Sequence, residues 1–369
     1  MAEKEVILVT GVAGYWGQRV AEKLLAQTPP GVEDNGAWLG RRYHVIGMDR
    51  EPPDKEIDGL DFIQADVRNP LLVDLLTAEK VHAVCHLAFE KSARPNESAF
   101  DANVIGTMKL LGACAEAGVR KVVLKSSMMV YGAAPSNPAF LTEQQPLKGK
   151  RSIGSVRDWV EIEAFCNGFR RQVPEMILTV LRFPSIIGPT VETPMTEFLS
   201  QPWTPVLLGF NPRMQIIHEG DVVDALVHAV MEDVPGVYNV AAAEVLPLAK
   251  LMAIAGKFPL PVFHLFAYWG NSLMGSVGLP VNQYWPLDPD YLRFPWVGSL
   301  ELMRNGFGFE PRYAAEEALR EYAGRLRLRR YLPESAALSF DEERLRDTIE
   351  RRRRARERLA YRQEGEDEK

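Results

Sequence analysis

The chain has 369 residues, of which 46% are hydrophobic and 25% are charged, as is usual for a soluble globular protein. Its 43 basic and 49 acidic residues give a formal net charge of −6, which argues against a strongly basic nucleic-acid-binding protein. Cys85, Cys114 and Cys166 are too few and too scattered for a disulfide framework or a zinc cluster. The charged start of the chain lacks a secretory signal pattern. We therefore expect a cytoplasmic protein without a metal site.

Short apolar runs typical of strands alternate with helix-like segments through the first two hundred residues. The strand-like runs are residues 6–9, 43–48, 62–65, 81–87, 121–124 and 177–181. Apolar residues at helical spacing predict the first helix over residues 18–27. Continuous apolar strands separated by helices are typical of a parallel sheet covered on both faces. The pattern predicts an α/β fold with a Rossmann-type, doubly wound parallel sheet.

The alternation breaks down after about residue 185, where proline and glycine become frequent and the elements become shorter. We expect a nucleotide-binding core over residues 1–185 and a smaller C-terminal α/β substrate lobe, interleaved with it, over residues 186–322. Residues 323–369 are expected to form a charged helical tail. Within that tail, residues 341–369 carry ten acids and ten bases, a mixture typical of a solvated helix rather than of a phospholipid- or nucleic-acid-binding patch.

A glycine-rich turn, Gly11-Val-Ala-Gly14-Tyr15-Trp16-Gly17, directly follows the first predicted strand. Glycine is needed where a backbone bends sharply, approaches a pyrophosphate or lets a helix pack closely on a strand. The following helix offers its N-terminal amides to the same phosphates. This strand–turn–helix context predicts a dinucleotide site to which Gly11, Gly14, Tyr15, Trp16 and Gly17 contribute. A tight structural turn is the alternative.

Asp49 and Arg50 end the second predicted strand. A carboxylate at this position accepts hydrogen bonds from the ribose hydroxyls and repels a 2′-phosphate, which favours NAD as the cofactor. Arg50 could instead pair with that phosphate, so NADP is the alternative. Gly17 and Asp49 are 32 positions apart, against about 20 in the usual pattern. The loop around residues 28–42 accounts for the excess, and loops tolerate such insertions.

Further patterns follow in order along the chain: Asp66-Val67, His86-Leu87-Ala88 and Phe100-x-x-Asn103-Val-x-Gly106-Thr107. With the Gly-x-x-Gly-x-x-Gly turn, the sequence over about residues 5–245 resembles the extended short-chain dehydrogenase/reductases, the NAD-dependent epimerase/dehydratase family. The resemblance implies that Asp66 and Val67 contact the adenine and that Leu87, Ala88 and Pro184 line the cofactor cleft. It also implies a structural or catalytic role for Asn103 beside the cofactor.

The segment Ser126-Ser127-Met-Met-Val130-Tyr131-Gly132 matches the family pattern Ser-Ser-x-x-Val-Tyr-Gly. The resemblance implies that Ser127 is catalytic and holds the hydroxyl or carbonyl oxygen of the substrate. Tyr131 is expected to pack at the substrate site and is not the family's usual acid–base group.

The tyrosine and lysine that transfer protons in this family, four residues apart, are missing. The best match places Ile153 at the tyrosine position and Arg157 at the lysine position. An isoleucine cannot move a proton. Arg157 could hold the nicotinamide ribose as the lysine does, although its fixed charge makes it a poor equivalent. The usual mechanism therefore needs a substitute proton carrier.

The candidates for this proton carrier are a displaced Tyr131, Asp158 or Glu161 on the same helix, and His218. His218 lies in a segment, Ile216-Ile-His218-Glu-Gly-Asp221, that resembles the family's substrate-pocket lining. We therefore expect His218 to contact the substrate, with a purely structural place at a helix entry as the alternative.

Residues 258–287 form a thirty-residue stretch without Asp, Glu, Lys or Arg. Repeated prolines and glycines argue against a membrane-spanning helix, because their backbone groups would be unsatisfied in hydrocarbon. A wall or lid over an apolar substrate pocket is the favoured interpretation. Ordinary lobe core is the first alternative, and peripheral membrane contact, aided by arginines further along the chain, is the second.

Two functions are compatible with these features. The first is an NAD(P)-dependent oxidoreductase or epimerase that acts on a secondary hydroxyl or carbonyl of a small molecule, either a sugar nucleotide or an apolar, sterol- or lipid-like compound. The second is a non-catalytic NAD(P)-responsive binding or scaffold protein. No nucleic-acid partner is expected. Helices at about residues 97–117 and 155–172 could form a homodimer interface by analogy with the superfamily.

Overall fold

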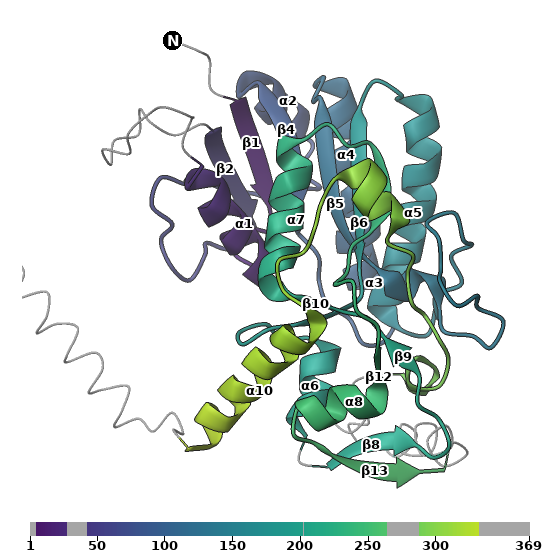
Figure 1. Cartoon of the computed structure of the whole chain (residues 1–369). Coiled ribbons are helices and arrows are strands. Elements are labelled where there is room, and N and C mark those ends of the chain that lie inside the picture. Colours follow the sequence, from purple (N-terminus) through teal and green to yellow (C-terminus); the bar gives the residue numbers. More distant parts are fainter. Residues whose placement is uncertain (1–4, 28–42, 202, 264–287, 332–369) are drawn as a thin grey trace, which may run out of the picture. The chain divides into compact units, whose positions relative to one another are not determined.

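The computed structural model describes residues 5–27, 43–201, 203–263 and 288–331 (Figure 1). Residues 1–322 form one compact unit, and residues 323–369 form a second. Helix α10, Ala315–Tyr331, contains the boundary between the two units.

Seven parallel strands form the main sheet in the order β11-β6-β5-β4-β1-β2-β3 (Figure 1). They are β1 (Glu5–Thr10), β2 (Tyr43–Asp49), β3 (Asp61–Gln64), β4 (Val81–His86), β5 (Lys121–Ser127), β6 (Ile177–Phe183) and β11 (Gly236–Asn239). The strand order changes direction between β1 and β4, as in a doubly wound sheet. The prediction of a Rossmann-type fold is confirmed.

Helices cover both faces of this sheet. Helices α1 (Tyr15–Leu25) and α7 (Glu219–Met231) pack against each other on one face. On the other face lie α2 (Leu72–Ala78), α4 (Gly106–Glu116) and α5 (Gly154–Gln172). Both faces of the sheet are therefore buried, which explains the uninterrupted apolar strands.

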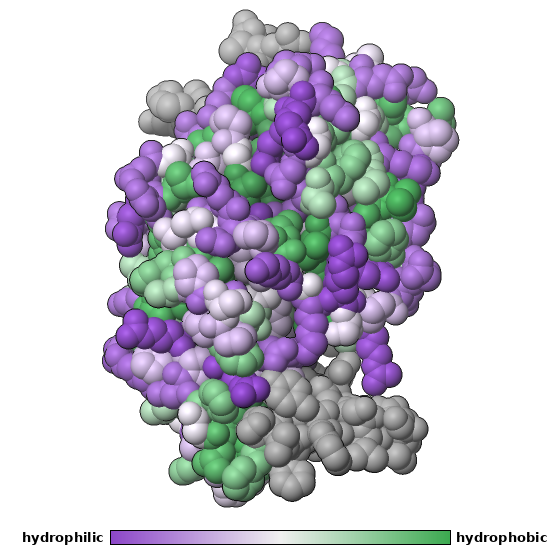
Figure 2. Space-filling model, turned by 90° about the vertical axis from the view of Figure 1, so that its right-hand side faces the viewer, coloured by the Kyte–Doolittle hydropathy of each residue, from purple (hydrophilic) through white to green (hydrophobic). Residues whose placement is uncertain are grey.

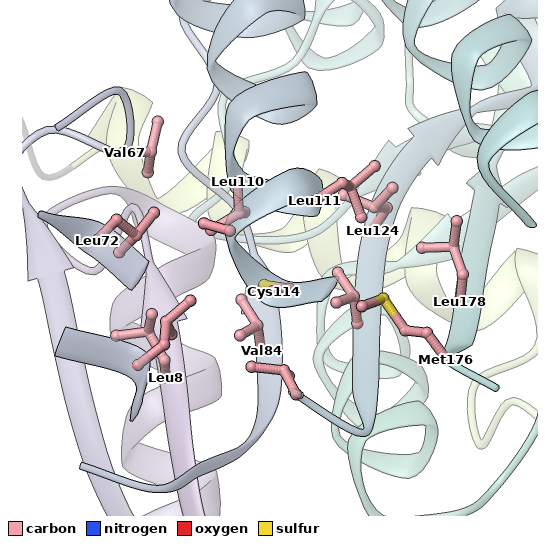
Figure 3. Packing of buried hydrophobic residues seen from close by; sticks show 14 of the residues in the cluster. Leu8, Val67, Leu72, Val84, Leu110, Leu111, Cys114, Leu124, Met176 and Leu178 are labelled. Carbon is pink, nitrogen blue, oxygen red and sulfur yellow. The ribbon is translucent and has the colours of Figure 1, made fainter. Parts of the chain in front are cut away.

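Buried side chains of the second face interlock between sheet and helices (Figure 3). Leu8, Val84, Leu124 and Leu178 project from four neighbouring strands toward Leu72 of α2 and Leu110, Leu111 and Cys114 of α4. Burying one such leucine contributes about 1.5–3 kcal/mol relative to leaving it exposed. All three cysteines are buried and free, as the small hydrophobic residues of a core.

The chain after β6 forms shorter elements and returns once to the main sheet through β11. These elements are β7 (Ser185–Ile187), α6 (Pro194–Ser200), β8 (Trp203–Leu207), β9 (Arg213–Met214), β10 (Ile216–His218), β12 (Leu246–Pro247), α8 (Leu248–Ile254) and β13 (Phe258–Val262). They pair as three two-stranded sheets, β10 with β7, β12 with β9, and β13 with β8. Because β11 completes the main sheet, residues after 185 contribute to the core.

The ribbon of β8 and β13 exposes several large apolar side chains. Trp203, Phe258 and Leu260 on the ribbon, with Phe263 just beyond it, are each more than two-fifths exposed. Figure 2 shows apolar surface gathered at the end of the molecule where Figure 1 places these strands. The ribbon contains the start of the uncharged stretch, whereas residues 264–287 lie outside the described residues. A wall, a lid or peripheral membrane contact there stays a prediction.

Within the described ranges, no helix is both long enough and apolar enough to cross a membrane.

Candidate functional site

A cleft opens at the carboxyl ends of β1, β2, β3 and β4, where the strand order of the sheet reverses. It is lined by Gly11, Gly14, Met48, Asp49, Arg50, Ala65, Asp66, Val67, Leu87, Ala88, Phe89, Glu90 and Ala102. Open α/β sheets bind ligands at this kind of edge, because the loops that leave neighbouring strands diverge there.

The glycine turn is packed too closely for larger residues. Gly11 has a φ of +75°, and a Cβ atom built on it would lie 2.5 Å from the backbone nitrogen of Ala88. A Cβ atom on Gly17 would overlap the carbonyl oxygen of Gly11. Gly14 precedes α1 and leaves the N-terminus of this helix without a side-chain cap. The turn therefore brings bare backbone and uncapped helix amides to the cleft, as phosphate binding requires.

The Asp49 carboxylate is held at the end of β2 by two backbone amides. Its Oδ2 accepts from Ala13 N at 2.9 Å, and its Oδ1 accepts from Arg50 N at 2.7 Å. The side chain of Arg50 forms an ion pair with Glu90 across the cleft, with 2.7 Å between nitrogen and oxygen. Asp49 thus connects the glycine turn to the position expected for the ribose, and the charge of Arg50 is balanced within the protein.

Asp66 is paired with Arg68 two residues later. The guanidinium donates to both carboxylate oxygens at 2.9 and 2.6 Å, and the Arg68 amide donates to Oδ1 at 2.8 Å. These contacts hold the pKa of Asp66 below its usual value. Arg68 also binds Asp101, so the pair joins the third strand to the helix that carries Asn103. Asp66 and Val67 remain part of the cleft lining.

His86 lies fully buried beneath the cleft at the end of β4. Its Nδ1 is 2.6 Å from the Thr10 hydroxyl, and its Nε2 is 3.0 Å from the Thr107 hydroxyl. Because Thr107 donates its own proton to the carbonyl oxygen of Asn103, Nε2 must be the protonated ring nitrogen. Burial lowers the pKa of His86 to about 3. The side chain is a neutral support for the cleft rather than an acid–base group.

This neutral histidine makes the protein sensitive to acid. The folded pKa of about 3 is below the ordinary value of 6.5, so the unfolded chain binds the proton more readily. The contribution of His86 to stability is complete above pH 6.5 and declines as the pH falls towards 3. We expect about 2 kcal/mol less stability at about pH 5 from this residue. Urea unfolding at about pH 5 and at a pH above 6.5 measures the loss.

His86→Gln removes the titrating group and should shrink the difference between the two pH values by most of that amount. His82→Gln, on the same strand, serves as the matched control and should leave the difference unchanged. An undiminished difference in His86→Gln would contradict the assignment.

Asn103 is buried and joins three segments. Its Oδ1 accepts from Glu90 N at 2.7 Å, and its Nδ2 donates to Glu90 O at 3.0 Å and to Asp158 Oδ2 at 2.9 Å. It lies on one turn of π-helix, Asp101–Ile105, between α3 (Glu97–Phe100) and α4. These contacts position Glu90 in the cleft wall and use all the bonding capacity of the amide nitrogen. A direct catalytic role for Asn103 stays a prediction.

The start of α5 carries Ile153 and Arg157, the residues predicted to stand in place of the family's tyrosine and lysine. Ile153 is the N-cap residue of the helix and packs against Val130, Val156 and Val160. Arg157 donates to Asp158 at 3.1 Å and to the carbonyl oxygen of Asn96 at 3.0 Å, and its guanidinium covers the ring of Phe100. Asp158 is almost fully buried by these partners. The structure thus directs Arg157 to the α3 segment, and a contact with the nicotinamide ribose stays a prediction.

Tyr131 belongs to a buried polar network. Its hydroxyl accepts from Arg182 at 2.6 Å and donates to Asn239 Oδ1 at 2.7 Å. Arg182 in turn binds Glu163 of α5, which also accepts from Ser126 at 2.5 Å. Burial raises the pKa of Tyr131 to about 12, the opposite of what an acid–base group needs. Tyr131 is therefore a buried packing residue in this structure, and a contact with the substrate stays a prediction.

Three more of the predicted residues have structural partners. His218 is the N-cap of α7: its Nδ1 accepts from Gly220 N at 3.1 Å, and its Nε2 lies 3.1 Å from Glu321. The hydroxyl of Tyr15 lies 2.8 Å from that of Thr190, and burial raises its pKa. Glu161 is paired with the exposed Arg151 at 2.7 Å. A substrate contact of His218 stays a prediction.

Ser127 lies at the end of β5 with its hydroxyl available. Its Oγ accepts from Met129 N at 3.2 Å, and no acceptor in the described part of the chain takes its proton. Lys125, two residues earlier, extends over the ring of Trp16 in the glycine turn, with Nζ 5.4 Å from the ring centroid. A place for Lys125 in the site was not predicted from the sequence. A charged residue next to an apolar strand-like run could have indicated it.

The predicted cofactor residues thus fall into two groups. Those that line the cleft are Gly11, Gly14, Asp49, Arg50, Asp66, Val67, Leu87 and Ala88. Those outside its lining are Tyr15, Trp16, Gly17, Asn103 and Pro184, the last of which is buried between β6 and β7. Among the described residues, no cluster of three or more His, Cys, Asp or Glu side chains could hold a metal ion.

Residues 7–241 match the model of the NAD dependent epimerase/dehydratase family. The chain belongs to this family. The resemblance and the expectation of NAD as the cofactor are therefore confirmed, and the cleft fits the cofactor because the bare backbone of Gly11 and Gly14 lines it beside the uncapped N-terminus of α1.

Similar proteins agree with this assignment. The uncharacterized protein Rv0501 of Mycobacterium tuberculosis is 32% identical over 329 residues, 86% of this chain and 83% of its own length. The UDP-glucose 4-epimerase of Mycolicibacterium smegmatis is 35% identical over 145 residues, 38% of this chain and 44% of the epimerase.

Among solved structures, MoeE5 in complex with UDP-glucuronic acid and NAD has a TM-score of 0.63 at 22% identity. The match covers 88% of this chain and 99% of MoeE5. UDP-glucose 4-epimerase of Thermus thermophilus with NAD has a TM-score of 0.62 at 21% identity, and the match covers 87% and 99% of the two chains. These similarities show a shared fold.

Proposed function

We propose that this protein is an NAD-dependent oxidoreductase or epimerase that acts on a secondary hydroxyl or carbonyl of a small molecule, with Ser127 holding the reacting oxygen. One observation carries the proposal: the Ser127 hydroxyl lies at the same edge of the sheet as the dinucleotide cleft and has a proton free to donate. Bound NAD would supply the hydride acceptor there. Gly11, Gly14 and Asp49 would hold the cofactor through its pyrophosphate and ribose.

Two substrate classes have support. A sugar nucleotide is supported by the similar proteins, which include a UDP-glucose 4-epimerase and a structure with UDP-glucuronic acid. A lipid- or sterol-like alcohol is supported by the exposed apolar ribbon of β8 and β13. The same cleft chemistry serves both classes, because each offers a carbinol carbon.

The alternative is a non-catalytic NAD-responsive binding protein. It is favoured by the start of α5, where Ile153 and Arg157 have packing and ion-pair partners in place of the usual tyrosine and lysine. Fluorescence titration with NADH tests what both functions share, and we expect saturable binding that is weaker for NADPH because of the Asp49 carboxylate. Absence of NADH binding at millimolar concentration would contradict both.

Turnover separates the two. Protein loaded with NAD is mixed with UDP-glucose, UDP-glucuronic acid, a 3-hydroxysterol and a polyprenol, and formation of NADH is followed by absorbance. At least one alcohol should reduce the cofactor. No reduction by any of the four and no epimerised product from either UDP-sugar, with NADH binding intact, would favour the binding protein.

The role of Ser127 is tested by Ser127→Ala. Removing an oxyanion-type donor lowers kcat by about 10²–10³-fold, and the NADH affinity should stay within about twofold because the serine is outside the dinucleotide lining. Ser200→Ala, at the exposed end of α6, is the matched control and should keep full activity. Full activity of Ser127→Ala would refute the role.

A further inference from the structure

Lys125 is a charged residue within the buried sheet. In the register of the sheet, Leu124 of β5 lies beside His86 of β4, so Lys125 lies level with Leu87 of the cleft lining. Side chains alternate along a strand. Because Ser126 faces Glu163 on one side, Lys125 and Ser127 share the opposite side of β5.

The Lys125 amine has aromatic rather than acidic neighbours. Its Nζ lies 5.4 Å from the ring centroid of Trp16 and 5.9 Å from that of Trp159, which come from α1 and α5. In the described part of the chain, no hydrogen bond or ion pair engages this amine. Lys121, four residues earlier on the same strand, differs: its Nζ donates to the carbonyl oxygens of Val230 and Glu232 and pairs with Asp233. Lys121 is structural, whereas the amine of Lys125 is available.

The surroundings of Lys125 stabilise its charged form only weakly. The two indole rings favour the ammonium form, but burial and the positive charge of Lys91, in the loop after β4, oppose it. Together they lower the pKa of Lys125 to about 8. No acidic side chain from α1, α5 or β4 is paired with it among the described residues. Both protonation states are therefore populated near neutral pH, which general acid–base catalysis requires.

The other side chains that were candidates for the proton carrier are engaged in structural contacts. Tyr131 is fixed by Arg182 and Asn239, and Asp158 is buried with Asn103 and Arg157. Glu161 is bound to an arginine, and His218 caps a helix. Of the residues described at this edge of the sheet, Lys125 combines a free amine with a place on the same side as Ser127.

We propose that Nζ of Lys125 exchanges the proton with the substrate oxygen, in place of the absent tyrosine. This proposal rests on the proposed function. In the oxidative direction the carbinol C–H bond would break, and NAD held in the cleft would supply the acceptor for its hydride. The O–H bond breaks as the C=O bond forms, and its proton passes to the neutral amine, giving an ammonium group. In the reductive direction the ammonium group returns this proton to the oxygen.

Two substitutions separate proton transfer from charge and packing. Lys125→Met removes the amine, and we expect kcat to fall by about 10²–10⁴-fold. Lys125→Arg keeps the charge but cannot release a proton, so it should not restore kcat. In the wild type, kcat/KM for oxidation should rise with increasing pH, with an apparent pKa near 8. This rise should be absent from the pH profile of Lys125→Arg. Lys109→Met, on the exposed side of α4, is the matched control and should match the wild type.

A second measurement needs no substrate. Lysines are reductively methylated with ¹³C-formaldehyde, and the Lys125 resonance is identified by its absence from the Lys125→Met spectrum. Its chemical shift should titrate near pH 8, well below the value of about 10.4 for ordinary lysines. Titration at or above pH 10 would overturn the proposal whatever the substrate.

These measurements separate the role of Lys125 from the proposed function of the protein. Turnover by the wild type with full activity of Lys125→Met, or with rescue by Lys125→Arg, would overturn the role of Lys125 and leave the proposed function standing. NADH binding without any turnover by the wild type would overturn the proposed function and this role with it.

Discussion

Glu163→Ala is expected to lower the free energy of unfolding by about 3–5 kcal/mol, because it leaves a buried guanidinium without its counter-charge. Arg182 and Glu163 are each only 2% exposed. Arg182 donates from Nε and from a terminal nitrogen to Glu163 at 2.9 and 2.5 Å, and Ser126 donates to the same carboxylate. Urea unfolding followed by circular dichroism at neutral pH measures the loss.

The neighbouring Glu161 provides a matched control. It lies two residues earlier on the same helix and pairs with Arg151, which is 69% exposed. Because exposed ion pairs contribute little, Glu161→Ala should cost less than about 1 kcal/mol. Glu163→Gln keeps an acceptor for Ser126 and should retain part of the stability if the alanine variant does not fold. Similar small losses for Glu163→Ala and Glu161→Ala would contradict the assignment.

Gly11→Ala should weaken NADH binding at least about a hundredfold. The residue has a φ of +75°, and its new Cβ atom would lie 2.5 Å from backbone atoms of Leu87 and Ala88, which cannot yield as a flexible side chain could. The turn and the end of β4 must therefore separate, and both line the cofactor cleft. Fluorescence titration with NADH measures the affinity, and circular dichroism checks that the sheet still forms.

Gly112→Ala, on α4, is the control for adding a methyl group. Apart from its chain neighbours and the backbone of its own helix, no described atom lies within 4 Å of the place that its Cβ atom would take, so the change should leave NADH affinity unaltered. It should also add about 0.5–1 kcal/mol of stability, because alanine favours a helix over glycine. NADH binding by Gly11→Ala with wild-type affinity would show that the turn does not approach the cofactor as proposed.

Local patterns accounted for the sheet and for much of the cleft. Strands buried on both faces appear as unbroken apolar runs, so β1, β2 and β4 to β6 were visible along the chain. The turn from Gly11 to Gly17 and the carboxylate of Asp49 were predictable because backbone geometry and strand ends restrict residue type locally. Met48 and Ala65 in the cleft wall gave no such signal, since an apolar residue at a strand end is compatible with many surroundings.

The partners of the polar side chains could not be predicted in this way. Tyr131 meets Asn239, 108 residues away, and Asn103 meets Asp158, 55 residues away. Such pairs form only when the sheet and its helices bring distant segments together. A motif shows which residue type stands at a position, but its hydrogen bonds depend on what the rest of the chain places beside it.

Residue type and local spacing were therefore enough to predict the family, the Rossmann-type sheet and a glycine-rich turn at the cleft. The folded structure was needed to show that Arg157 is paired toward α3 and that Tyr131 is held in a buried network. It was also needed to show that the Lys125 amine lies near two indole rings and has no acidic partner among the described residues. The physical reason is that burial and charge, which set the reactivity of a side chain, are properties of its folded surroundings.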